Sequence, residues 1–422
     1  MARDAPIEHD LRWPVVTLAE IVTKIGSGAT PKGGADAYLP SRARFALVRS
    51  QNVFDRRFDH DGLAFISDQQ ADGLRSVVLQ PDDILLNITG DGITFARACM
   101  VPKDVLPACV NQHVSIIRLD SQRADPGYVL AFLTHPEVKS YMESFNAGGS
   151  RRAITKGHIE SFRLPLPPLP EQRAIAHILG TLDDKIGLNR RMNDTLEAMA
   201  RALFKSWFVD LELIRTKTAD LIREGVLEIG DGYRAKNSEL GATGLPFLRA
   251  GNLNAGFDTA NADVLLEKSV AKAGSKISRV GDIAFTSKGT IGRFARVTQG
   301  TPQFVYSPQV CYWRSLQPSK LQPIILYCWM LSDDLKEQID AVAGQTDMAL
   351  YVSLQDQRRM SMPTFPSSQN VIARRMEPLF ARQSSITSET KTLAALRNTL
   401  LPKLISGELR VKDAEKIAAK AL

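Results

Sequence analysis

The chain has 422 residues, of which 44% are hydrophobic and 23% charged, and this length allows two or three domains with cores of their own. No apolar run reaches the length of a membrane span, and the N-terminus MARDAPIEHD is polar and acidic, so we expect neither a membrane protein nor a secretory signal. The four cysteines form no CxxC pair and no metal-ligand spacing, which predicts reduced core thiols in a cytoplasmic protein.

The formal net charge of +7 is typical of many nucleic-acid-binding proteins, but its location weakens that interpretation. Residues 366–422 hold 10 Lys and Arg against 5 Asp and Glu, so most of the excess lies near the C-terminus. A more useful signal is local, because Arg beside Asn or Gln is the chemistry that reads guanine and adenine edges. Any one such cluster could equally be a solvated surface.

Residues 1–165 are predicted to form an α+β module. Short β-rich runs alternate with Gly, Asn and Asp turns, and a helical patch covers 125–144. The glycine-rich segment GSGATPKGG at 26–34 lacks the Lys-Ser/Thr ending of a phosphate-binding P-loop.

Residues 166–210 are predicted to form one long helix. Apolar residues recur at alternating steps of four and three, from Ile175 through Leu182 and Ile186 to Leu203 and Trp207, which is a heptad seam. Pro170 is placed for the first helical turn. About 37 residues at ~1.5 Å each would give a rod of roughly 55 Å.

Residues 211–365 repeat the first module faintly, about 200 residues later. ALVRSQNV at 46–53 resembles FLRAGNL at 247–253, and Asp82-Asp83-Ile84 matches Gly281-Asp282-Ile283. Three further matches support the repeat: Phe95-Ala96-Arg97 with Phe294-Ala295-Arg296, Val114–Arg118 with Val310–Arg314, and Gly148-Gly149-Ser150 with Gly344-Gln345-Thr346.

Residues 366–422 are predicted to form a second long helix and a tail, and the helix keeps the first seam at an offset of 197. Pro378 should kink this helix or delay its start, and Pro402 and Gly407 should end it. Both seams turn polar near the middle, at Asn189, Asn193, Gln383 and Thr390. These four positions could fix register as buried polar residues or could simply face water.

The fold predicted from these elements is α+β, with two similar globular modules separated by two long antiparallel coiled-coil helices in a pseudo-two-fold internal repeat. Enzyme motifs are sparse in the sequence. It contains neither GxxxxGK[ST] nor HExxH nor the Asn/Asp-Pro-Pro-aromatic motif of amino-methyltransferases. Asp82 with Glu137 and Lys139 could imitate a metal-dependent nuclease, a pattern that arises by chance in most chains of this length.

The segment from Leu164 to Asp210, with PLPPLPEQRAIAHIL and LEAMARALFKSWFVD, closely resembles the central conserved region of specificity subunits of type I restriction–modification systems. LPKLISGELRV near the C-terminus resembles their distal conserved region. The resemblance implies that 1–165 and 211–365 are target-recognition domains, each reading one half of a split, asymmetric DNA target. It also implies that the conserved helices at 166–210 and 366–422 separate the half-sites, by about one turn of DNA.

The resemblance implies a cytoplasmic, non-catalytic chain that binds double-stranded DNA and two methyltransferase subunits, and restriction subunits through them. We expect no cofactor in this chain: S-adenosylmethionine would be held by the methyltransferase partner, and ATP and Mg by the restriction partner.

The expected DNA-binding residues are polar side chains in the repeated segments of both modules. They are Arg49, Gln51, Asn52, Thr89, Asn111, Gln112, Ser150, Arg151 and Arg152 in the first module, and Asn237, Arg249, Asn252, Ser287, Lys288, Gln309, Gln345 and Thr346 in the second. Asn52 and Asn252 share a module position and could equally be turn-formers.

The expected partner-binding residues lie on the first helix. They are Arg173, Asp184, Arg191, Glu197, Arg201, Phe204 and Phe208, whose alternative role is a solvated helix face with core aromatics. Two other classes stay open at this point. A coiled-coil scaffold without DNA affinity would bind no DNA at low salt, and a single-chain nuclease would cleave DNA in a metal-dependent way.

Overall fold

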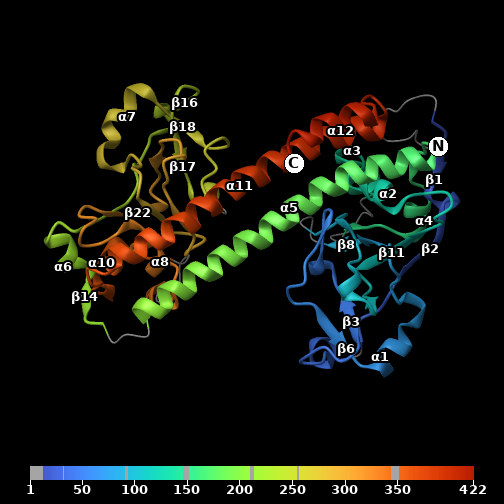
Figure 1. The fold of residues 1–422 in the computed structure, drawn as a ribbon, viewed down its shortest axis with the longest axis horizontal. Coiled ribbons are helices and arrows are strands. Elements are labelled where there is room, and N and C mark those ends of the chain that lie inside the picture. The colour runs from blue at the N-terminus through green and yellow to red at the C-terminus, as the bar shows by residue number, and fades with distance from the viewer. Residues whose placement is uncertain are drawn as a thin grey trace. The chain divides into compact units, whose positions relative to one another are not determined.

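A computed structural model describes residues 13–31, 33–90, 94–145, 152–209, 213–253, 256–343 and 351–422 (Figure 1). The chain divides into two compact units: unit 1 is residues 1–190 with 387–422, and unit 2 is residues 191–386. Both units include part of each long helix, α5 (Leu169–Phe204) and α11 (Gln369–Ser406). No helix in the described ranges is long and apolar enough to cross a membrane.

Unit 1 contains two main sheets. A four-stranded antiparallel sheet has the order β2-β11-β7-β9, and a three-stranded sheet has the order β10-β3-β6, in which β3 and β10 are parallel. Its strands are β1 (Val15–Thr17), β2 (Val22–Ser27), β3 (Phe45–Val48), β4 (Val53–Phe54), β5 (Arg57–Phe58), β6 (Ala64–Ile66), β7 (Ile84–Asn87), β8 (Thr89–Gly90), β9 (Ala98–Met100), β10 (Ala108–Val110), β11 (Val114–Leu119), β12 (Arg152–Ala153) and β13 (Arg163–Pro165). Its shorter helices are α1 (Asp68–Gly73), α2 (Pro126–Leu133), α3 (Pro136–Glu143), α4 (Lys156–Glu160) and α12 (Val411–Ala419).

Unit 2 repeats this plan with the sheet orders β15-β22-β19-β20 and β16-β18-β17-β21, and β17 and β21 are again parallel. Its strands are β14 (Arg215–Lys217), β15 (Leu227–Gly230), β16 (Leu240–Gly241), β17 (Gly244–Leu248), β18 (Asp263–Leu266), β19 (Ile283–Thr286), β20 (Phe294–Arg296), β21 (Val305–Tyr306), β22 (Val310–Ser315) and β23 (Ser361–Pro363). Its shorter helices are α6 (Thr218–Arg223), α7 (Glu267–Ala273), α8 (Pro323–Met330), α9 (Asp333–Ala343) and α10 (Leu354–Arg359). The predicted α+β class and internal repeat are confirmed.

One predicted correspondence between the modules has the wrong register. Ile84 and Ile283 are equivalent, but Ile84 pairs with Met100 whereas Ile283 pairs with Arg296. The connection from β7 to β9 is residues 88–97, three longer than residues 287–293 between β19 and β20. Arg97 therefore corresponds to Arg293, not to Arg296.

A buried aspartate–arginine pair recurs in both units. In unit 1, Arg118 Nε and Nη2 donate to the two carboxylate oxygens of Asp83 at 2.7 and 2.8 Å. In unit 2, Arg314 makes the same bidentate pair with Asp282 at 2.6 and 2.8 Å. Both aspartates have 0% exposure, and each precedes the central strand β7 or β19. Each pair therefore ties the start of one strand to its neighbour, β11 or β22.

A buried glutamine fixes the start of each long helix. Gln172 accepts a hydrogen bond from Asp125 N at 2.9 Å and donates to Arg123 O and Pro167 O. At the same offset of 197, Gln369 accepts from Gln322 N at 3.0 Å and donates to Lys320 O and Phe365 O. Each glutamine joins its helix to the N-terminus of α2 or α8 within its own unit.

The two long helices are antiparallel within each unit. In unit 1, Asp183 of α5 pairs with Arg397 of α11, and Lys185 of α5 pairs with Glu389 of α11. The later residue of α5 thus contacts the earlier residue of α11, as expected for antiparallel helices. In unit 2, Ala200 and Phe204 of α5 share a core with residues 372–380 of α11.

Most apolar positions of the predicted seam are buried in the structure, whereas the polar positions near its middle differ in exposure. Ile175, Leu179, Leu182 and Ile186 have 2% exposure or less. Asn189 has 1% exposure, so it is a buried polar residue, whereas Asn193, Gln383 and Thr390 are half-buried. At the C-terminal end of α5, a π-helical turn at Lys205–Val209 leaves Trp207 37% exposed and buries Phe208 instead.

Two effects predicted for the prolines of α11 were wrong. The helix runs through both Pro378 and Pro402, so Pro378 does not delay its start and Pro402 does not end it. Pro378 and Arg374 lie on the exposed face, where water can hydrate the carbonyl that a proline leaves without its helical donor. The helix ends at Ser406, and Gly407 follows it as predicted, with a φ of 77° that is the left-handed conformation of a C-terminal glycine.

The cap of α3 predicts a pH dependence of stability. His135 has 3% exposure, and its Nδ1 accepts a hydrogen bond from Glu137 N, which needs a neutral ring. Burial lowers the pKa of His135 below its usual 6.5, so the unfolded chain binds a proton before the folded one does. Stability should be full above pH 6.5 and fall by about 1 kcal/mol as acidification removes the cap. Denaturation between pH 7.5 and 5 measures this, and His135→Asn, which caps without titrating, should flatten the curve. An unchanged slope in that variant would contradict the assignment.

Candidate nucleic-acid interface

The predicted DNA-binding residues of unit 1 follow two parallel strands, at the edge where both strands end. β3 ends at Val48 and is followed by Arg49, and β10 ends at Val110 and is followed by Asn111. Asn111 N donates to Val48 O at 3.0 Å, which joins the two loops. Because parallel strands end on the same side of a sheet, loops far apart in the sequence meet here. We call this the reading edge of unit 1, made of residues 49–52, 89–90 and 111–113.

The first loop of the reading edge is a turn held by Asn52. Its Oδ1 accepts from Arg49 N at 3.1 Å, and its Nδ2 donates to Asp59 O and Asp61 O at 3.0 and 3.2 Å. With 0% exposure, Asn52 is a turn-former, the alternative that the sequence left open. Gln51 is exposed and Arg49 half-buried, and both donate to Gly62 O. The turn therefore presents Arg49 and Gln51.

The second and third loops of the reading edge form a hydrogen-bonded chain centred on His113. Thr89 Oγ1 lies 2.6 Å from His113 Nδ1, and Gln112 Nε2 lies 3.2 Å from His113 Nε2. Asn111 is buried, and its Oδ1 accepts from His113 N, so it positions the loop. His113 is not among the DNA-binding residues expected from the sequence. Here its ring orients both neighbours.

A glycine lets a neighbouring loop approach the same edge closely. Gly28 N donates to Asn111 O at 3.1 Å, and a Cβ at Gly28 would lie only 1.8 Å from Val110 O. In unit 2, a Cβ at Gly232 would lie 2.0 Å from Ser307 O. The glycine-rich segment that resembles no phosphate loop thus serves backbone packing.

Unit 2 builds an equivalent reading edge with different side chains. Ser307 N donates to Leu248 O at 3.0 Å, as Asn111 does to Val48. Asn252 Oδ1 accepts from Arg249 N at 2.9 Å, which repeats the turn of Asn52. Arg249 is exposed and pairs with Asp263, and Gln309 and Lys288 are exposed.

Two further residues expected in unit 2 differ in exposure. Ser287 has 1% exposure and its Oγ accepts from Cys311, so it faces the interior. Asn237 is exposed on a short 3-10 turn, Asn237–Glu239. Of the remaining expected residues, Ser150, Arg151, Gln345 and Thr346 lie outside the described residues, as does the side chain of Arg152.

The expected partner-binding residues separate into two groups. Arg173, Asp184, Arg191 and Arg201 are exposed on α5 and Glu197 is half-buried. Phe208, by contrast, has 2% exposure and packs on Phe365 with ring centroids 5.0 Å apart, so it is a core aromatic.

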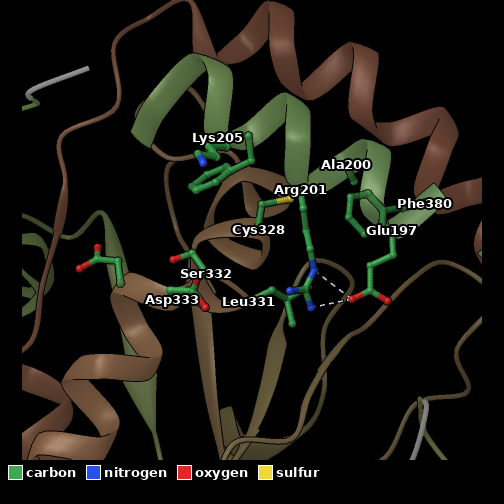
Figure 2. A pocket seen from close by; sticks show the side chains of 11 residues that line it. Glu197, Ala200, Arg201, Lys205, Cys328, Leu331, Ser332, Asp333 and Phe380 are labelled. Carbon is green, nitrogen blue, oxygen red and sulfur yellow. Dashed lines mark hydrogen bonds and ion pairs between the residues drawn. The ribbon is translucent and has the colours of Figure 1, made fainter. Parts of the chain in front are cut away.

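Three of the expected partner-binding residues line a pocket of about 300 Å³ in unit 2. Figure 2 shows Arg201 paired with Glu197 at its rim, facing the turn between α8 and α9. Phe204 lines it together with Ala200, Lys205, Cys328, Leu331, Ser332, Asp333, Asp334 and Phe380. The walls are apolar toward α11 and charged toward α9.

The described residues hold no group of three or more His, Cys, Asp or Glu side chains suited to a metal ion. The four cysteines are free and buried, as predicted. Burial raises the pKa of Cys109 to about 11 and of Cys328 to about 12, so these thiols stay protonated near neutral pH.

The fold and its repeated edge define a class of protein: a chain of two similar α+β units, each of which contains part of two long antiparallel helices. The family model described as "Type I restriction modification DNA specificity domain" matches residues 12–198. Residues 12–198 thus match the specificity domain of type I restriction–modification systems, and the chain as a whole is similar to the specificity subunits of these systems.

Individual proteins agree with this assignment. The specificity subunit of the type I restriction enzyme MjaIX of Methanocaldococcus jannaschii is 26% identical over 65% of this chain and 67% of its own length. The EcoKI specificity subunit of Escherichia coli is 22% identical over 94% of this chain and 89% of its own. The crystal structure of an S subunit from M. genitalium shares the fold, with a TM-score of 0.61, 14% identity, and coverage of 95% of this chain and 99% of that one.

Proposed function

We propose that this chain reads a bipartite, asymmetric DNA target, one half with each reading edge, and that it is non-catalytic by itself. The observation that supports the proposal is that both units form the same backbone arrangement at the reading edge but place different polar side chains on it. Thr89 and His113 of unit 1 correspond to Lys288 and Gln309 of unit 2, at the same hydrogen-bonding positions of the backbone. Because the donors and acceptors differ, the two half-sites should differ.

The proposed partners are double-stranded DNA, two methyltransferase subunits docked on the helices, and restriction subunits bound through them. The similarity to specificity subunits of type I restriction enzymes supports this assembly. S-adenosylmethionine would belong to the methyltransferase, and ATP and Mg to the restriction subunit. DNA as the ligand supports a cytoplasmic location.

The test is methylome sequencing of a methylation-deficient host that carries this chain with its methyltransferase subunit. A new split motif that disappears when this chain is deleted is the expected result. Replacing residues 1–165 with another such module should change one half of the motif and preserve the other. No new motif with both proteins expressed and associated would favour the scaffold function. A swap that alters both halves would refute the two-edge arrangement.

A further inference from the structure

A group of arginines gathers in unit 1 where the β4–β5 hairpin meets the two long helices. Arg57 and Arg97 both lie over the ring of Phe54, with guanidinium carbons 4.3 and 4.4 Å from its centroid. Arg56 from the same hairpin reaches Asp183 of α5 at 2.5 Å, and Arg397 of α11 reaches Asp183 at 2.7 Å. Arg190 lies about two helical turns after Asp183 on α5, near enough to Arg57, Arg397 and Asp183 to interact with their charges, and we call these five arginines the arginine cluster.

The arginine cluster holds more positive charge than its carboxylates neutralise. Asp183 forms ion pairs with Arg56 and Arg397, and Asp59 forms an ion pair with Arg57 at 3.0 Å. Within the described residues, neither Arg97 nor Arg190 forms an ion pair. The neighbouring pairs Lys139–Asp55 and Lys185–Glu389 are balanced and add no net charge. Five guanidinium groups thus face two carboxylates.

Arg190 reports the resulting repulsion. Arg190 is exposed, and partial desolvation is the first cause that lowers the pKa of its guanidinium group. Arg57 and Arg397 lower this pKa further, and each of them outweighs the opposing effect of Asp183. Holding like charges together costs free energy that a bound anion would recover.

Comparison with unit 2 shows that Arg97 is not needed for the fold in the way its counterpart is. Arg293 donates to Ala250 O and Leu253 O and so holds the turn before β18. In unit 1, the equivalent carbonyls of Ser50 and Val53 are bound by Asn87 instead. Because Asn87 already binds these carbonyls, Arg97 does not hold the turn. Its guanidinium group stacks on Phe54 and pairs with no carboxylate of the described residues.

We propose that Arg57, Arg97 and Arg190 together bind a phosphodiester group of the DNA backbone. Arg57 lies on the hairpin that directly follows the Arg49–Asn52 turn, so the site would hold the duplex against unit 1 beside the reading edge without reading sequence. Guanidinium groups suit this role because they donate several hydrogen bonds to phosphate oxygens. The proposal rests on the proposed function, since it deepens the contact with DNA.

The test is the salt dependence of duplex binding by the full chain in complex with its methyltransferase subunit. Arg97→Gln and Arg190→Gln should each reduce the slope of log K against log salt by about 0.9. The affinity deficit of each variant should therefore shrink roughly threefold between 50 and 200 mM salt. Each variant should lose the same factor in affinity for a duplex that contains the target sequence and for one that does not, because a phosphate contact carries no sequence information.

The control is Arg123→Gln, which removes the same charge beside Gln172, at the other end of the unit 1 part of α5. Its slope should equal that of the unaltered complex. Thermal melting separates binding from folding: Arg190→Gln relieves repulsion, so its melting temperature should hold or rise while affinity falls. Unchanged slopes in Arg97→Gln and Arg190→Gln would overturn the phosphate site. If the unaltered complex bound no DNA at low salt, the proposed function itself would fail.

Discussion

Asp282→Ala is expected to lower the free energy of unfolding of unit 2 by about 3–5 kcal/mol. The change removes the bidentate partner of Arg314, whose side chain has only 5% exposure, and leaves that buried charge with the longer Glu228 contact at 3.3 Å as its remaining ion pair. It also removes the acceptor for Arg279 N at 2.9 Å and for the Tyr306 hydroxyl at 3.0 Å. Denaturant unfolding of the complete chain measures the effect.

Asp83→Ala should have a smaller effect in unit 1, about 3 kcal/mol, because Arg118 is 20% exposed and water can partly solvate it. The control is Glu377→Ala, which breaks an ion pair with Arg296 in which the glutamate is 54% exposed. That change should cost about 1 kcal/mol or less. If Asp282→Ala and Glu377→Ala lowered the free energy of unfolding equally, burial of the ion pair would not determine the size of the effect.

Gly28→Ala is expected to distort the reading edge of unit 1 and to destabilise that unit by about 3 kcal/mol. Its Cβ would lie 1.8 Å from Val110 O and 2.9 Å from Val110 C, and both are backbone atoms that cannot rotate away. The strand end that carries Asn111 must therefore move, and DNA affinity should fall with stability. Thermal melting and duplex binding together measure this.

Gly26→Ala provides the matched control two residues earlier, where the nearest atom to a new Cβ is Val77 Cγ1 at 3.9 Å. It should be neutral or stabilise by about 0.5 kcal/mol, since alanine loses less freedom on folding. Gly232→Ala should reproduce the Gly28 defect in unit 2, where Ser307 O lies 2.0 Å from the new Cβ. If the Gly28→Ala and Gly26→Ala variants had the same affinity for DNA, the close approach of Gly28 to Val110 would not be needed for DNA binding.

The site illustrates how far a residue's type predicts its role. Arg49, Gln51 and Gln112 gather on one edge because β3 and β10 are parallel neighbours, although their loops are about 60 residues apart. Thr89 comes from a third loop and joins this edge through His113. Asn52, Asn111 and Ser287 have the same polar chemistry but are buried. Arg97 and Arg293 occupy one position, yet only Arg293 holds backbone carbonyls, because Asn87 takes that role in unit 1.

The two long helices, their shared seam and the two-module repeat could be predicted from the amino-acid sequence. These features depend on local periodicity and on a constant offset, and both are visible along the chain. Other features became apparent only in the folded chain: the β20 register, the continuity of α11 past Pro378, the buried glutamines that start each helix, and the arginine cluster. Each of these depends on hydrogen bonds, charges or solvent contact between segments that the sequence does not place together. A side chain's partner across a sheet or helix pair is set by packing, so it has no periodic signal along the chain.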